Sequence, residues 1–188
     1  VFLGTILGAL LFFMKASQLS IFGIKPLKWI ANIYIEIIRG TPMLLQIMLV
    51  YSGSKMVLGL DITAFLSAVI AISLNSAAYV SEIVRAGIEA VDKGQMEAAR
   101  SLGMSKALAM KEIIIPQAVK NILPAIGNEF VAVIKESSMA SVIGVGELMF
   151  AANIVTGATF MSIEPLAVSA VLYFVLTFSL GRLMGYLE

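Results

Sequence analysis

The fold is decided around the stretch Glu97-Ala98-Ala99-Arg100-Ser101-Leu102-Gly103 and the Ile113-Ile114-Ile115-Pro116 that follows it nine residues later. These residues bound a polar, charged island between long apolar runs. A chain that otherwise avoids water has little physical reason to keep a helix-forming surface segment there unless a partner docks against it. The island therefore predicts a docking segment.

The composition places most of the chain in lipid. Of its 188 residues, 60% are hydrophobic and 13% are charged, whereas soluble domains have about 45–50% and about 25%. A soluble fold of this size could not hide so much apolar surface. The formal net charge of +1 gives no bulk electrostatic attraction to nucleic acid.

The absence of cysteine and histidine narrows the possible functions. Disulfides, the usual zinc and haem sites, and catalysis by imidazole or thiolate all need those side chains. The sequence also has no phosphate-binding loop of the form G-x-x-x-x-G-K-[ST]. We therefore expect no catalytic residue, no metal site and no cofactor in this chain.

Five segments approach the roughly 20 apolar residues that a helix needs to cross a hydrocarbon core of about 30 Å. They are residues 1–13, 30–60, 62–90, 116–134 and 165–187. The first is interpreted as a span that continues upstream, because it has neither the basic leader nor the cleavage site of a signal peptide. Arg39-Gly40-Thr41-Pro42 interrupts the second, and residues 135–164 are neither polar nor a clean span. The sequence thus predicts an all-α integral membrane protein with a single domain, residues 1–188, and about five transmembrane helices.

The basic residues orient these spans. Most of them lie in the connections after the first and third spans, namely Lys15, Lys25, Lys28, Lys93, Arg100, Lys106 and Lys111. The opposite side has Lys55 and Lys135. We therefore expect the island, residues 91–112, and the C-terminus to be cytoplasmic.

The island is predicted to form a helix at the cytoplasmic surface. Asp92 can cap its start, and Pro116 suits the first turn of the next span. Gly103 is expected to end or kink the helix, because glycine costs about 1 kcal/mol relative to alanine in a helix interior. Two adjacent alanines and the glycine give a smooth surface that a partner can approach closely. On the pattern alone, an interfacial helix without a partner remains the alternative.

The spacing E-A-A-x3-G-x9-I-x-I-P resembles the EAA loop of the permease subunits of bacterial ABC importers, with Ile115 where leucine is usual. Local matches to the polar amino-acid branch extend along essentially the whole chain. They are Arg39-Gly40-Thr41-Pro42 with Gln46, Asn75 with Ala78-Tyr79 and Glu82, Arg85-Ala86-Gly87-Ile88, Gly94-Gln95, Asn128-Glu129 and Lys135-Glu136-Ser137-Ser138.

The resemblance implies a permease with a five-helix core in the bacterial cytoplasmic (inner) membrane. Its implied partners are a second permease subunit, two ABC ATPase subunits that bind ATP and Mg²⁺, and an extracytoplasmic amino-acid-binding protein. The island would be the coupling helix, which transmits ATP-driven closure so that the path opens to one side at a time. The residues implied in ATPase contact are Glu97, Ala98, Ala99, Arg100, Ser101, Leu102 and Gly103.

Polar side chains at membrane depth are the candidates for the substrate pathway. Asn75 either bonds another helix or faces a wet cavity, since an unpaired buried amide costs a few kcal/mol. Irregular backbone at depth is tolerated where it lines a cavity or is buried in protein, which favours residues 135–164. Glu136 and Glu164 could favour arginine-, lysine- or histidine-like substrates. The full candidate set is Asn75, Ser76, Tyr79, Glu136, Ser137, Ser138, Asn153, Thr156 and Glu164.

The charged residues near the spans leave other interpretations open. Glu36–Arg39 and Glu82–Arg85 are predicted to be structural pairs at i, i+3. In an ion-coupled carrier or channel for small polar solutes, Glu82 or Glu129 would instead be a proton or cation site. A membrane-embedded enzyme has little support without histidine or cysteine, and a non-transporting scaffold for the ATPase remains a further alternative.

Overall fold

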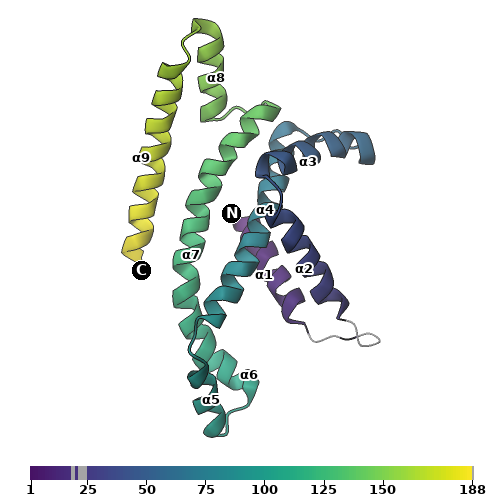
Figure 1. Ribbon diagram of the computed structural model, residues 1–188, viewed down its shortest axis with the longest axis vertical. Coiled ribbons are helices and arrows are strands. Elements are labelled where there is room, and N and C mark those ends of the chain that lie inside the picture. The colour runs from purple at the N-terminus through teal and green to yellow at the C-terminus, as the bar shows by residue number, and fades with distance from the viewer. Residues whose placement is uncertain (18–19, 21–24, 188) are drawn as a thin grey trace.

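The computed structural model describes residues 1–17, 20 and 25–187, and every regular element in that part of the chain is a helix. The prediction of an all-α membrane fold is confirmed. The long helices α4 and α7 run through the middle of the molecule, with α1 and α2 on one side and α9 on the other (Figure 1). The elements are α1 (Phe2–Ala16), α2 (Pro26–Arg39), α3 (Met43–Leu58), α4 (Ala64–Glu89), α5 (Lys93–Ser101), α6 (Lys106–Ala109), the π-helix η1 (Met110–Ile114), α7 (Ile115–Glu136), the 3₁₀-helix η2 (Ser137–Ile143), α8 (Leu148–Thr159) and α9 (Ile163–Leu187).

Within the described residues, two helices, α4 and α9, are individually long and apolar enough to cross a membrane. Two bent pairs meet the same test together: α2 with α3, and residues 106–143 with α8. The apolar helix α1 is shorter, at 15 residues. Helix α9 is hardly covered by the rest of the chain, since 6% of its most apolar window is buried. Its apolar side chains therefore face lipid or another subunit.

The second predicted span, residues 30–60, is broken at Arg39-Gly40-Thr41-Pro42, as the interruption in the sequence predicts. It forms α2 and α3, and the helix axis bends by 109° at the corner between them. Pro42 has an extended backbone (ψ 139°) and stands at the N-cap of α3, and proline also disfavours a helical conformation of the residue before it. The hydroxyl of Thr41 donates to the Ile37 carbonyl oxygen at 2.9 Å, which satisfies one of the open carbonyl groups at the end of α2. The interruption seen in the sequence is therefore a sharp corner.

Helix α4 is the centre of the packing, and its buried face consists mostly of alanine, serine and glycine. Gly4 and Gly8 of α1 lie directly against it. A Cβ atom added to Gly4 would be 2.7 Å from Cβ of Ser76, and one added to Gly8 would be 2.7 Å from Cβ of Val80. Small residues let helix backbones approach closely, which is how helices associate where lipid removes the hydrophobic driving force. Helices α1, α2, α3 and α7 all pack on α4.

The sequence after α7 predicts a loop at residues 141–146 followed by a short helix from Glu147, and the start of that helix is confirmed. Gly144 ends η2 in the left-handed conformation (φ +86°), and Glu147 caps the start of α8. Part of the predicted loop, up to Ile143, is a 3₁₀-helix instead. This 3₁₀-helix packs against α3, α4, α7 and α8, and Ala140 within it is buried, so protein covers part of the irregular segment.

Gly8→Ala is expected to lower the melting temperature of the purified protein in detergent. The added methyl group meets Val80 and the Ala77 carbonyl, and overpacking of this kind costs about 1–3 kcal/mol. Gly53→Ala in α3 is the matched control, because no atom of the described residues lies within 4 Å of its added Cβ and alanine is the better helix former. Equal or higher stability of Gly8→Ala relative to Gly53→Ala would contradict the close contact between α1 and α4.

Candidate functional site

The predicted docking segment is a short helix, α5, with defined ends. Oδ1 of Asp92 accepts a hydrogen bond from the Gly94 amide at 2.7 Å, which confirms Asp92 as the N-cap. Gly103 follows the helix with φ +85°, and its amide donates to the Arg100 carbonyl oxygen at 3.0 Å. The prediction that Gly103 ends the helix is confirmed. A left-handed residue at this place is the usual way to close a helix, and glycine adopts it without steric cost.

Six of the seven residues predicted to contact the ATPase lie on the surface of this chain. Ala99 is the exception: its methyl group is 5% exposed, so it packs against its own chain. Leu102 is 86% exposed and gives this surface one large apolar side chain. We call the exposed set the coupling surface, and it consists of Glu97, Ala98, Arg100, Ser101, Leu102 and Gly103.

Asn75 bonds another helix, which was one of the two alternatives from the sequence. Its Nδ2 donates to Oε1 of Gln46 at 2.9 Å, and both residues are buried. Nε2 of Gln46 in turn donates to the Ile38 carbonyl oxygen at 2.7 Å, and to the carbonyl and hydroxyl oxygens of Thr41 at 3.1 and 2.9 Å. Because a carbonyl oxygen can only accept, these contacts fix the orientation of the amide. Gln46 therefore holds the corner between α2 and α3 against α4.

The other predicted pathway residues of α4 also face neighbouring helices. Ser76 is fully buried and faces the carboxylate of Glu129 on α7, although its hydroxyl forms no hydrogen bond of ordinary geometry. Tyr79 is half-buried beneath Arg39, whose Cζ lies 5.3 Å from the ring centroid. The polar face of α4 is thus largely an interhelical surface, next to one half-buried carboxylate.

The predicted pathway residues after α7 fall into two groups. Glu136, Ser137 and Ser138 lie where α7 meets η2, and the two hydroxyls donate to the Ile134 and Lys135 carbonyl oxygens at 2.7 and 2.6 Å. The second group lies on α8 and at the start of α9, which extend beyond the C-terminal end of α7 (Figure 1). In that group Thr156 is half-buried, and Asn153 and Glu164 are exposed. The structure does not gather all nine candidates into one site.

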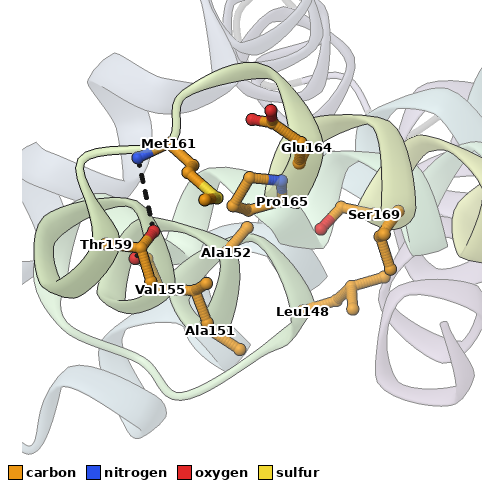
Figure 2. Close-up of a pocket in the computed structure, with 10 residues that line it drawn as sticks. Leu148, Ala151, Ala152, Val155, Thr159, Met161, Glu164, Pro165 and Ser169 are labelled. Atoms are coloured by element: carbon orange, nitrogen blue, oxygen red, sulfur yellow. Dashed lines mark hydrogen bonds between the residues drawn. The ribbon is translucent and has the colours of Figure 1, made fainter.

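A cavity of about 360 Å³ lies between α8 and α9, and its lining is almost entirely apolar. Glu164 is the member of the predicted pathway set that reaches it, with Val155 on one wall and Pro165 on the other (Figure 2). A wall of this kind offers few partners for the ammonium and carboxylate groups of an amino acid.

Glu147, the N-cap of α8, also joins this helix to α9. Its two carboxylate oxygens accept from the amides of Phe150 and Met149 at 2.7 and 2.8 Å. The hydroxyl of Tyr173 on α9 donates to Oε2 of the same carboxylate at 2.8 Å. A carboxylate at a helix N-terminus is stabilised by the helix dipole, and this one also fixes the neighbouring helix.

Of the two ion pairs predicted from the sequence, one forms. Nη2 of Arg85 lies 2.9 Å from Oε2 of Glu82, as expected for an i, i+3 pair. The predicted Glu36–Arg39 pair is wrong. Arg39 stands at the last position of α2 and leans across Tyr79, so that its Nη1 lies 3.7 Å from Oε2 of Glu82 on α4. Tertiary contact overrides the local spacing here.

Gln46→Met is expected to destabilise the protein more than Leu45→Met does. Methionine has a similar size but cannot donate, so the Ile38 and Thr41 carbonyl groups and the Asn75 amide lose a partner. An unsatisfied buried polar group costs about 1–3 kcal/mol. Leu45 is 45% exposed, so its substitution serves as the control in the same thermal-unfolding measurement. Equal melting temperatures for the two variants would show that the amide does not hold the corner.

Comparison with known proteins agrees with this architecture. The family model described as "Binding-protein-dependent transport system inner membrane component" matches residues 3–188. The chain is 48% identical to the "Arginine transport system permease protein ArtQ" of Bacillus subtilis, over 93% of this chain and 77% of the relative. It is 42% identical to the "Putative glutamine transport system permease protein GlnP" of Rickettsia conorii, over 100% of this chain and 84% of the relative.

The similar solved structures are also ABC transporters. A chain in the structure described as "Crystal structure of an amino acid ABC transporter with histidines" is 49% identical and superposes with a TM-score of 0.92. The match covers 99% of this chain and 84% of that one. An inward-facing methionine ABC transporter, 16% identical with a TM-score of 0.71, shares the fold.

Proposed function

We propose a function from one premise: the chain belongs to the family of binding-protein-dependent transport system inner membrane components. In this proposal it is a permease subunit of an ATP-driven importer for polar amino acids in the bacterial inner membrane. It forms part of the pathway together with a second permease subunit, receives substrate from an extracytoplasmic binding protein, and works by alternating access. The hydrolysis of ATP takes place in two separate ATPase subunits, and the C-terminal end of α9 lies on their side of the membrane.

The observation that carries this proposal is the coupling surface on α5. It combines the spacing of the EAA loop with a capped helix whose outward side is exposed. Residues 90–92 connect α5 to α4, and α6 with η1 connect it to α7. A partner that moves α5 therefore acts on the two long central helices at once. Motion of this kind is what alternating access requires.

Two groups of observations support amino acids as the substrate and cationic ones as the preferred class. The relatives are named for arginine and glutamine transport, and the similar solved structure is described as containing histidines. Glu129 and Glu136 lie two turns apart on α7 and are both half-buried. Among the described residues, neither forms an ion pair. Carboxylates placed in this way favour a cationic side chain in the adjacent path.

The ion-coupled carrier is the rival function, and one observation weakens it. Glu82, one of its two proposed proton sites, is within 4 Å of cationic groups from three helices and is therefore held in its charged form. Proteoliposomes with the ATPase partner separate the two functions. Uptake that persists with an inactive ATPase but collapses with the proton gradient would favour the carrier.

Gly103→Trp is expected to reduce both ATPase co-purification and ATP-driven uptake by tenfold or more, equivalent to about 1.4 kcal/mol of binding. No described residue has an atom within 4 Å of the added Cβ, so the indole would project into the partner's space. Gly103→Ala is the matched control, because it has the same strain at φ +85° without the bulk. If ATPase binding and uptake both survive the tryptophan, the assignment of the coupling surface is wrong.

Glu129→Gln is expected to weaken arginine uptake relative to glutamine uptake, by about tenfold if one charge contact of roughly 1.4 kcal/mol is lost. The substitution removes charge but keeps size. Asn128→Asp, on the exposed side of the same helix turn, is the control for a change of charge away from the path. Competition with labelled arginine measures the preference. If neutral amino acids outcompete arginine in the unchanged protein, the cationic preference is wrong.

A further inference from the structure

Three helices converge on one carboxylate, that of Glu82 on α4. Nζ of Lys15, in the last turn of α1, lies 2.6 Å from Oε1. Nη1 of Arg39, the last residue of α2, lies 3.7 Å from Oε2, and Nη2 of Arg85 lies 2.9 Å from that same oxygen. These residues are far apart in the sequence, and local spacing predicts only the contact with Arg85.

The cluster has more cationic than anionic side chains, so its charge balance depends on the carboxylate of Glu82. The side chain of Glu82 is 14% exposed, whereas Lys15 and Arg39 are 23% and 44% exposed. Glu89 also pairs with Arg85, but it lies on the exposed side of the helix, at 62%. Without Glu82, three cations would face one another in a half-buried site with that single outer carboxylate as compensation. Loss of one member of a partly buried ionic network leaves uncompensated charge, which is far more costly than loss of an exposed pair.

The cluster also acts on the corner between α2 and α3. Arg39 directly precedes the corner, and its guanidinium rests on the Tyr79 ring before it reaches Glu82. On the other side of the corner, Gln46 of α3 accepts a hydrogen bond from Asn75, which lies nearer the start of α4. The corner is thus fixed to α4 at two levels, one ionic and one through neutral amides.

We propose that Glu82 is a positioning residue that makes α1, the α2–α3 corner and α4 a single body, which moves with α5 during the transport cycle. Glu82 lies two helical turns before the end of α4 at Glu89, and three residues separate that end from α5. A rigid α4 carries a displacement of α5 to Glu82, and the ion pairs carry it to α1 and α2. This inference rests on the proposed ATP-driven function, but the rigidity that it requires is measurable without transport.

The absence of cysteine from the sequence permits a direct test. Spin labels at Trp29→Cys on α2 and Ala90→Cys after α4 report one distance in the assembled complex; both positions are exposed. We expect the same narrow distribution without nucleotide and with ATP trapped. Glu82→Gln is expected to broaden it, and Glu89→Gln, the matched control, to leave it unchanged. A distribution that Glu82→Gln does not alter, or that shifts with ATP in the unchanged protein, would overturn the proposal.

Transport measurements distinguish a positioning role of Glu82 from an effect on the stability of the protein alone. In Glu82→Gln we expect the amount of substrate imported per ATP hydrolysed to fall by about fivefold, the lower end of usual coupling between sites. Adding Lys15→Gln removes one of the repelling cations, so it should restore assembly and melting temperature without restoring this ratio. If the ratio recovers together with stability, the role of Glu82 is structural only.

A second variant covers the case in which Glu82→Gln does not assemble. Arg39→Gln removes the α2 contact alone, from a side chain that is 44% exposed, and should assemble with a broadened distance distribution. An unbroadened distribution there would overturn the proposal. Failure of the proposed function looks different: the unchanged complex would show no ATP-dependent uptake, whereas the label distances would still report the rigidity of the four helices.

Discussion

The close approach of backbones around α4 is the constraint on which the rest of the structure depends. Lipid tails are as apolar as leucine, so helices in a membrane gain little from hiding apolar side chains from one another. They gain from dispersion contacts and interhelical hydrogen bonds, and both require short distances. Gly4 and Gly8 on α1, and the alanines and serines of α4, provide those distances. A polar side chain such as Asn75 reaches a partner on the next helix only because the helices are this close.

Composition and periodicity predicted the parts of the fold that depend on the solvent. The apolar length of α4 and α9, the capped helix at Asp92, its end at Gly103 and the break before Pro42 all follow from local chemistry. The direction of the chain after Pro42 does not, because Gln46 and Asn75 set it across 29 positions. The same limit explains the wrong pair Glu36–Arg39: spacing along one helix cannot show that a carboxylate on α4 lies nearer.

The same contrast between local chemistry and contacts between distant residues applies to the candidate site. The exposure of residues 97–103, Ala99 excepted, could be predicted because they are neighbours in the sequence and lie on or just after one short helix, whereas their contact with an ATPase stays a prediction. The pathway set could not be assembled from sequence, since hydroxyl and amide groups at depth are used both for packing and for solute contact. The amide of Asn75 and the hydroxyls of the two serines at the start of η2 donate hydrogen bonds to groups of their own chain. Glu129 and Glu136 form no ion pair within the described residues, and that difference distinguishes candidate contact groups from structural ones.

The two sides of the molecule are held by different means, and this affects how motion can pass through it. Helices α1 to α4 are joined by close backbone contact, by an amide tie and by an ionic cluster. Helix α9 packs on α7 and α8, but little of its surface is covered; the carboxylate of Glu147 and the contact of Met184 with Gly127 are among the few specific contacts. Deforming the first group would break several contacts at once, whereas α9 can shift against lipid at lower cost. Because α5 connects α4 to α7, a displacement of α5 would act on both helices, and relative movement would concentrate where contacts are sparse.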